Sequence, residues 1–201
     1  MKVNYQKELE KTLDKIGDKV PRLLLHSCCA PCSSYVLEYL SNYFEITVLY
    51  YNPNIYPEEE FSKRLAEQKH LLKQMNFKNS VKVIDKGYNP QEFYNAVRGL
   101  ENEKEGGARC EKCFYLRLMK CGEIAKQGGF DYFTTTLSIS PLKSAEVLNR
   151  IGGEISQKVG VPYLYSDFKK KDGYKRSVLL SAQYGLYRQN YCGCIYSKNE
   201  A

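Results

Sequence analysis

The cysteines of this chain are the side chains with the clearest capacity for chemistry, and they are clustered. The chain has 201 residues and eight cysteines, of which all but Cys121 fall into three short groups that lie far apart in sequence. Thiols grouped in this way indicate a site that is assembled only by folding. The groups are Cys28, Cys29 and Cys32; Cys110 and Cys113; and Cys192 and Cys194.

The first two groups have the spacing of metal ligands. Cys28 and Cys29 are adjacent, so in a turn their side chains can diverge, whereas the C-x-x-C spacing of Cys110 and Cys113 lets two thiolates converge at the start of a helix. Two thiolates from each group give four ligands, which suit either a tetrahedral Zn²⁺ or a [4Fe–4S] cluster. The spacing favours a metal over free thiols and leaves both metals open.

The remaining thiols allow several roles. One glycine separates Cys192 from Cys194, so the pair can form a strained, easily reduced disulfide that passes electrons; two further metal ligands or a reduced turn are the alternatives. Cys32 is either a thiolate near the metal or a small apolar side chain in the first turn of a helix. Cys121 shares helical spacing with Leu118, which predicts core packing.

The chain has only two histidines, His26 and His70. His26 ends a predicted strand beside the first cysteines, where it can donate a proton or serve as a hydrogen-bonded structural residue. His70 lies among charged residues of a predicted helix, which indicates a surface position.

Composition and charge are those of a globular protein. Hydrophobic residues make up 43% of the chain, no run approaches the roughly 18–20 apolar residues of a membrane span, and the first residues lack the apolar segment of a secretion signal. We therefore expect a cytoplasmic protein with reduced thiols, which favours metal or redox chemistry over structural disulfides. The net charge of +7 is compatible with a polyanionic partner without requiring one.

Basic residues in the C-terminal third of the chain are interleaved with tyrosines. Cations and aromatic rings arranged in this way can bind phosphates and stack on unpaired bases, so the stretch is a candidate RNA-binding segment. An ordinary basic surface is the alternative. The candidate residues are Lys169, Lys170, Lys171, Lys175, Arg176 and Arg188.

Strands and helices alternate along the chain, which predicts an α/β fold: a single doubly wound domain over residues 1–201, with its core at about 20–197, a mainly parallel sheet and helices on both faces. Ligands of such folds gather at the carboxyl ends of the strands, where the first cysteine group is placed. Ser33 or Ser34 is expected to cap the helix after that turn, and Ser140-Pro141 to start a later helix. The predicted strands are 23–25, 45–51, 81–84, 130–135 and 162–165.

Several short segments spread over most of the chain form a pattern in a fixed order. They are His26-Ser27-Cys28-Cys29-Ala30-Pro31-Cys32-Ser33, Tyr51-Asn52-Pro53-Asn54-Ile55, Arg109-Cys110-Glu111-Lys112-Cys113-Phe114, Thr136-Leu137, Ser140-Pro141 with Lys143, Asp167-Phe168-Lys169-Lys170, and Tyr187-Arg188-Gln189-Asn190-Tyr191-Cys192-Gly193-Cys194. This pattern resembles the QueH-type epoxyqueuosine reductases. Tyr56 departs from it, since relatives often have histidine there.

The resemblance implies a nucleotide-hydrolase-like α/β fold and the reduction of epoxyqueuosine to queuosine at the wobble base of tRNA, with an unidentified electron donor. The reaction consumes two electrons and two protons, and His26 is a candidate proton donor. The implied ligands of a [4Fe–4S] cluster are Cys28, Cys29, Cys110 and Cys113. The implied redox-active pair is Cys192 and Cys194, and Cys32 and Asp167 are the expected ligands of an additional iron ion.

Two other functions remain open from the residues alone. A zinc-stabilised RNA-binding module would use the same four thiols without redox chemistry. An ATP-dependent enzyme that inserts sulfur into tRNA could share the broad fold, although no phosphate-binding glycine loop follows the first predicted strand.

Overall fold

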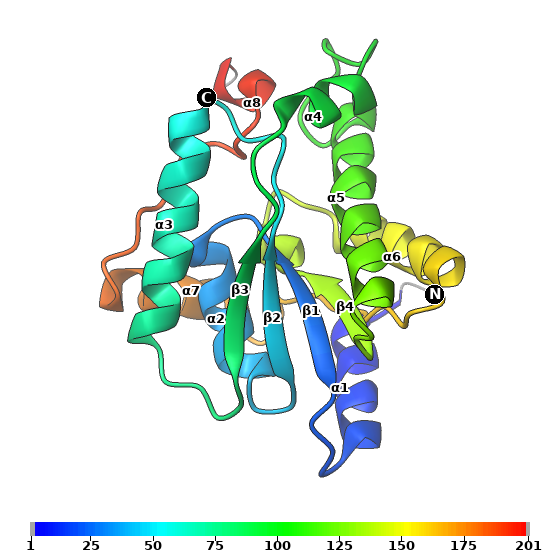
Figure 1. Ribbon diagram of the computed structural model, residues 1–201. Coiled ribbons are helices and arrows are strands. Elements are labelled where there is room, and N and C mark those ends of the chain that lie inside the picture. Colours follow the sequence, from blue (N-terminus) through cyan, green and yellow to red (C-terminus); the bar gives the residue numbers. More distant parts are fainter. Residues whose placement is uncertain (1–2, 200–201) are drawn as a thin grey trace.

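The computed structural model describes residues 3–199 and has an α/β architecture built on a parallel sheet (Figure 1). The described residues form a four-stranded sheet with strand order β3-β2-β1-β4, in which every neighbouring pair is parallel. The α/β fold with a parallel sheet is therefore confirmed, while the domain limits of 1–201 stay a prediction. The strands are β1 (Arg22–Ser27), β2 (Glu45–Tyr50), β3 (Val81–Asp85) and β4 (Tyr132–Thr135).

Helices cover both faces of the sheet, as the alternation of elements predicted. Successive residues of the central strand β1 point to opposite faces, so Leu24 packs with α5 and α6, whereas Leu25 packs with α1 and α2. Each such fully buried leucine contributes roughly 1.5–3 kcal/mol to stability. The helices are α1 (Tyr5–Ile16), α2 (Ala30–Leu40), α3 (Glu58–Gln74), α4 (Pro90–Ala96), α5 (Ala108–Gln127), α6 (Ala145–Val159), α7 (Gly173–Gln183) and α8 (Ile195–Asn199).

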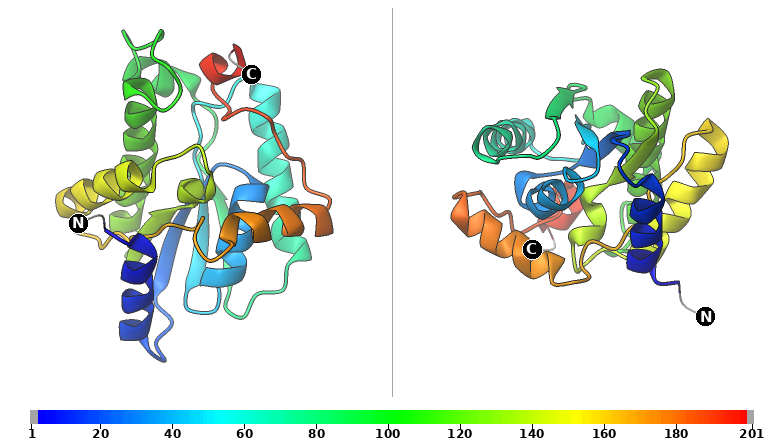
Figure 2. Two further views of the ribbon diagram at one scale, coloured as in Figure 1. Left: turned by 180° about the vertical axis from the view of Figure 1, so that it is seen from behind. Right: turned by 90° about the horizontal axis from the view of Figure 1, so that it is seen from below.

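The C-terminal segment connects distant parts of the fold. After α7, which packs on α2, the chain passes α3 to α8, which lies beyond the carboxyl ends of the strands (Figure 2). This path brings the third cysteine group to the edge of the sheet where the first group lies. No helix in the described residues 3–199 is long and apolar enough to cross a membrane.

Two predicted helix starts, at Ser33 or Ser34 and at Ser140-Pro141, were wrong. The helix α2 begins at Ala30 with Cys29 as its N-cap, and the hydroxyls of Ser33 and Ser34 instead donate to the carbonyls of the preceding turn. Pro31 in the first turn fixes this earlier start. The segment after β4 forms a 3₁₀ turn over Thr136–Ile139, and α6 begins only at Ala145, capped by Ser144.

A fifth strand is also absent from the described residues. The segment 162–165 contributes only an isolated bridge between Phe133 and Tyr163. The backbone of Phe133 exchanges hydrogen bonds with Pro162 and Leu164 at 3.1 and 2.9 Å, so the segment lies along β4 without extending the sheet regularly.

Candidate functional site

The first cysteine group lies where β1 gives way to α2. Cys28 follows the last residue of the strand, Cys29 caps the helix, and Cys32 belongs to its first turn. The Sγ atoms of Cys28 and Cys29 are 3.8 Å apart, and the three Sγ atoms of the group lie within 4.8 Å of one another. Among the described residues this is the one group of three possible ligands that are close enough to hold a metal ion.

Polar side chains that the sequence did not single out fix this turn. Gln68 of α3 accepts hydrogen bonds at its Oε1 from the hydroxyls of Ser27 and Ser33, each at 2.8 Å. Asn52, which follows β2, donates from its side chain to the carbonyl of Ser27 at 2.8 Å. All four side chains are buried, so a buried hydrogen-bond network holds the turn.

The three thiols of this turn share negative charge unequally. Hydrogen bonds from Cys29 and Cys32 hold the pKa of Cys28 well below its usual range, and the cations Lys143 and Arg117 act in the same direction. Burial is the main cause that raises the pKa of Cys29 to about 12, and the hydrogen bond with Cys28 acts in the same direction. The hydrogen bonds with Cys28 and Cys29 likewise raise the pKa of Cys32. Cys28 is thus the most acidic thiol of the group.

The second cysteine group lies in the first two turns of α5, at the start of a helix as its spacing predicted. The amide of Gly106 donates to the Sγ of Cys110 at 3.2 Å. Cys113 is buried, and this burial raises its pKa to about 12. Both thiols lie outside the close group at the β1–α2 turn.

The third cysteine group packs beside the second. Cys194 belongs to one buried apolar cluster with Cys113, Phe93 and Val97. The Sγ of Cys194 accepts a hydrogen bond from the amide of Ser197 at 3.4 Å. The structure describes Cys192 and Cys194 as free cysteines.

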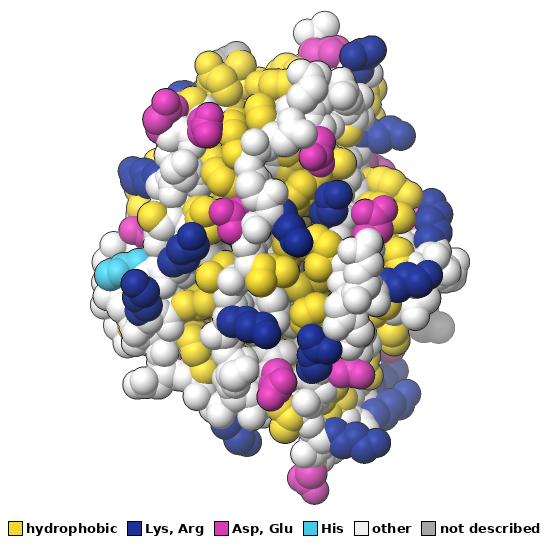
Figure 3. Space-filling model, in the orientation of Figure 1, with side chains coloured by type: hydrophobic (Ala, Val, Ile, Leu, Met, Phe, Trp, Pro, Cys, Tyr) yellow, Lys and Arg dark blue, Asp and Glu magenta, His cyan; other side chains and the backbone are white. Residues whose placement is uncertain are grey.

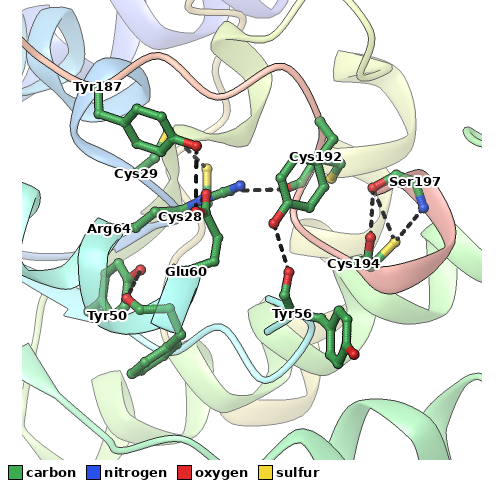
Figure 4. Close-up of polar contacts among 12 residues, drawn as sticks. Cys28, Cys29, Tyr50, Tyr56, Glu60, Arg64, Tyr187, Cys192, Cys194 and Ser197 are labelled. Carbon is green, nitrogen blue, oxygen red and sulfur yellow. Dashed lines mark hydrogen bonds and ion pairs between the residues drawn. The ribbon is translucent and has the colours of Figure 1, made fainter. Parts of the chain in front are cut away.

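A clamp from α3 holds the loop of Cys192 and Cys194 (Figure 4). The guanidinium of Arg64 donates to the carbonyl of Cys192 at 3.2 Å and to Glu60 at 2.7 Å, and it lies 5.1 Å from the ring centre of Tyr191. Gly193 lies against the same guanidinium with φ of +125°, and a Cβ there would come within 3.0 Å of the Arg64 Nη1. The loop therefore needs both the arginine and the glycine.

The same loop is tied to the segment after β2. The amide of Tyr56 donates to the carbonyl of Gly193 at 2.8 Å, and the hydroxyl of Tyr191 donates to the carbonyl of Tyr56 at 2.7 Å. Tyr56, the position that departs from the resemblance, thus contributes its backbone to the site.

A single cavity joins the first and third cysteine groups. It has a volume of about 380 Å³, and Cys28, Cys32 and Cys192 all line it. A substrate in this cavity would meet thiols from both ends of the chain. Its charged and aromatic lining residues are Glu105, Lys143, Tyr174, Arg188 and Tyr191.

Two cations, the buried Arg117 and the half-buried Lys143, make the surroundings of the thiols electropositive. Arg117 of α5 is 1% exposed, and its Nη2 is buried without a hydrogen-bond partner. Burial lowers the pKa of Lys143, and the Cys192, Cys28 and Cys32 thiols outweigh that effect and raise it. Cations placed in this way fit a centre in which several thiolates carry negative charge. The residues present therefore fit a metal–sulfur group.

His26 occupies a position that suits the structural alternative. It is fully buried, its Nδ1 lies 2.9 Å from the hydroxyl of Thr135, and its Nε2 lies 3.2 Å from the carbonyl of Tyr51. Burial lowers the pKa of His26 to about 4, so the ring is neutral near pH 7. The Nε2 proton is used to hold Tyr51, and His26 does not line the cavity.

Asp167 lies apart from the thiols. It lines a second pocket with Lys169 and Lys170, and its carboxylate forms an ion pair with Lys169 at 3.1 Å. That pocket shares the segment 141–143 with the first cavity. The structure thus places Cys32, but not Asp167, in the close group of possible metal ligands.

The six predicted RNA-binding residues differ in their surroundings, and their role stays a prediction. Lys169 is half-buried and donates to the carbonyls of Ser138 and Lys143, so it is part of the fold. Lys171 forms an ion pair with Glu10, and Arg176 forms a bidentate ion pair with Glu38. Figure 3 shows the face opposite α7, on which basic and acidic side chains are interspersed. Of the six, Lys170, Lys175 and Arg188 are exposed and form no ion pair with residues 3–199, and Arg188 lines the cavity.

Comparison with known proteins identifies the family. The family model described as "Epoxyqueuosine reductase QueH" matches residues 23–200. The protein of that name from Streptococcus pyogenes serotype M1 is 42% identical over 201 residues, with 98% of this chain and 78% of the relative covered. The chain belongs to the QueH family. Its namesakes from Staphylococcus epidermidis and Haemophilus influenzae are 41% and 38% identical, covering 98% and 93% of this chain and 85% and 76% of the relatives.

Membership of the QueH family confirms the resemblance and favours a reductase over the zinc-stabilised module and the sulfur-inserting enzyme. It leaves the role of each thiol as a prediction. Sequence reasoning missed the buried polar residues Arg64, Gln68 and Arg117. Arg117 carried a usable signal, because it follows Cys113 by four residues and therefore lies on the same face of a helix.

Proposed function

We propose that this protein reduces epoxyqueuosine to queuosine at the wobble position of tRNA. The observation that carries the proposal is the cavity that Cys28, Cys32 and Cys192 line together, because it brings possible metal ligands and a thiol of the C-terminal pair to one substrate-sized space. The family name of its relatives, epoxyqueuosine reductase, supports the same chemistry. A cytoplasmic location follows from a tRNA substrate.

The proposed cofactor is a [4Fe–4S] cluster. Bound by four thiolates, such a cluster supplies electrons singly. Cys32 and Asp167 remain the proposed ligands of an additional iron, and binding at Asp167 requires its ion pair with Lys169 to open. The proposed cluster ligands are Cys28, Cys29, Cys110 and Cys113.

Oxidation of the Cys192 and Cys194 thiols can supply the electrons and protons that the proposed reaction consumes. Removing the epoxide oxygen breaks two C–O bonds, forms a C=C bond and releases water, which consumes two electrons and two protons. Oxidation of the Cys192 and Cys194 thiols to a disulfide releases two electrons and two protons. One turnover can therefore be balanced by this pair, which an external electron donor then reduces again.

Lys143 is proposed to stabilise the departing oxygen. Its side chain lines the cavity beside Cys28 and Cys32, and its raised pKa keeps it protonated. A cation that is already in place lowers the energy of negative charge that develops on an oxygen. Arg188 lines the same cavity and is proposed, with exposed Lys170 and Lys175, to hold RNA phosphates, so binding should weaken with salt.

Mass spectrometry of nucleosides from tRNA tests the proposed function. Anaerobically purified protein, a reductant and tRNA that carries epoxyqueuosine should yield a nucleoside that has lost one oxygen. The Cys192→Ser variant should lose this activity, whereas Cys121→Ser, which changes a core cysteine away from the cavity, should keep it. Gain of sulfur with consumption of ATP would overturn the proposal.

A further inference from the structure

Arg117 is a buried guanidinium to which the proposed reaction assigns no role. Its side chain is 1% exposed, its Nε donates to the carbonyl of Cys113 at 3.2 Å, and its Nη2 is buried without a hydrogen-bond partner. Within residues 3–199 no carboxylate forms an ion pair with it. Arg64, which is equally buried, pairs with Glu60 at 2.7 Å. Arg117 therefore differs from Arg64 in lacking a carboxylate.

A buried cation without a counter-charge is strongly unfavourable, so the negative partner of Arg117 must come from other groups. The neighbouring groups are thiols. Cys113, Cys192 and Cys28 lie close enough for negative charge on their sulfur atoms to act on the guanidinium. These three residues represent the three cysteine groups, one from each.

The position of Arg117 on α5 accounts for this arrangement. It follows Cys113 by four residues, which is about 6 Å along a helix axis and on the same face. The carbonyl of Cys113 fixes one edge of the guanidinium and leaves the Nη2 free. A sulfur of a thiolate or of a cluster is an acceptor of the kind that this free N–H lacks.

We propose that Arg117 is a positioning residue that provides the positive counter-charge of the metal–sulfur centre and raises its reduction potential. This inference rests on the proposed function, in which four thiolates hold a [4Fe–4S] cluster. Such a centre carries net negative charge, and each added electron makes it more negative. A unit positive charge within about 10 Å, at an effective dielectric constant of about 20, changes a one-electron equilibrium more than tenfold.

The test compares Arg117→Met with two matched controls in anaerobically reconstituted protein. Arg117→Lys keeps the charge, and Lys112→Met removes a charge that is exposed on the same helix. Iron and sulfide are measured per chain, and the cluster is titrated with dithionite while EPR records its reduced form. Arg117→Met should lower the equilibrium constant for reduction at least tenfold, a shift of about 59 mV to more negative potential. Arg117→Lys should recover most of that shift, and Lys112→Met should stay within twofold of the parent.

Urea unfolding of the cluster-free proteins provides the second readout. Arg117→Met should be no less stable than the parent, because it removes a buried charge that has no carboxylate partner. If Arg117→Met is this stable yet fails to take up iron, the counter-charge role is supported. If it is destabilised without the cluster, or binds the cluster with an unchanged potential, the inference is wrong while the proposed function stands. If the parent protein holds no iron–sulfur cluster, the proposed cofactor fails and the inference fails with it.

Discussion

Replacing Arg64 by methionine removes the contact through which α3 holds the Cys192–Cys194 loop. The guanidinium donates to the carbonyl of Cys192 at 3.2 Å and to Glu60 at 2.7 Å, and the two charged side chains are 1% and 11% exposed. Removing one partner of a buried ion pair leaves the other charge without compensation, which costs about 3–5 kcal/mol. We expect Arg64→Met to lose stability in this range.

A double variant separates the ion pair from the loop contact. In Glu60→Gln/Arg64→Met no unpaired charge remains, so the cost should fall to about 1–2 kcal/mol, which is the value of the hydrogen bond to Cys192. The double variant should therefore be more stable than Arg64→Met alone. Arg150 and Glu154 form the matched control, because they are also four residues apart on a helix but nearly half exposed. Arg150→Met should cost less than about 1 kcal/mol.

The assay is urea unfolding of the cluster-free variants under anaerobic, reducing conditions, with the free energy of unfolding extrapolated to water. The proposed role of Arg64 in holding the loop would be refuted if the free energy of unfolding of Arg64→Met were as high as that of Arg150→Met. It would also be refuted if adding Glu60→Gln made Arg64→Met less stable, since the loss would then not come from an unpaired charge.

Three further predictions concern the loop, the metal and pH. Gly193→Ala places a Cβ on a residue with φ of +125°, 3.0 Å from the Nη1 of the buried Arg64. The resulting strain of about 1–3 kcal/mol should displace the loop and lower kcat at least fivefold in steady-state assays, and an unchanged kcat would contradict this. Cys32→Ser should reduce bound iron, measured per chain, whereas Cys121→Ser should not, and equal iron content in both would exclude Cys32 as a ligand. The pKa of His26 is about 4 in the folded state and about 6.5 in the unfolded state. Between these two pH values the unfolded chain binds a proton at His26 and the folded protein does not, so the folded state loses stability as the pH falls. Between pH 6.5 and pH 4 the free energy of unfolding of the cluster-free parent should fall by about 3 kcal/mol more than that of His26→Asn. Parallel pH profiles of the unfolding free energy in the two proteins would refute this.

The sheet and the first cysteine group could be predicted because their signals are local. An apolar run such as 23–25 followed by clustered thiols marks the end of a buried strand and the start of a helix, and the structure places Cys28 directly after β1. The helix start itself was misplaced. Two serines, Ser33 and Ser34, offered caps, but Pro31 in the first turn decided the boundary, and only the folded backbone distinguishes these choices.

The partners of charged residues could not be predicted, because they come from distant parts of the chain. Arg176 has the composition of an RNA-binding residue, yet Glu38 on another helix occupies its guanidinium. Lys169 likewise points inward to two backbone carbonyls. Long-range packing also brings Arg117 near Cys192. The sequence spacing predicts only that Arg117 lies near Cys113.

The central claim is that thiols from separate parts of the chain form one iron–sulfur centre that reduces epoxyqueuosine in tRNA. The most direct measurement determines iron, acid-labile sulfide and zinc in anaerobically purified protein, and follows the conversion of tRNA by the same sample. We expect four irons and four sulfides for the cluster, together with loss of one oxygen from the modified base. A colourless, zinc-loaded protein that is fully active would contradict it.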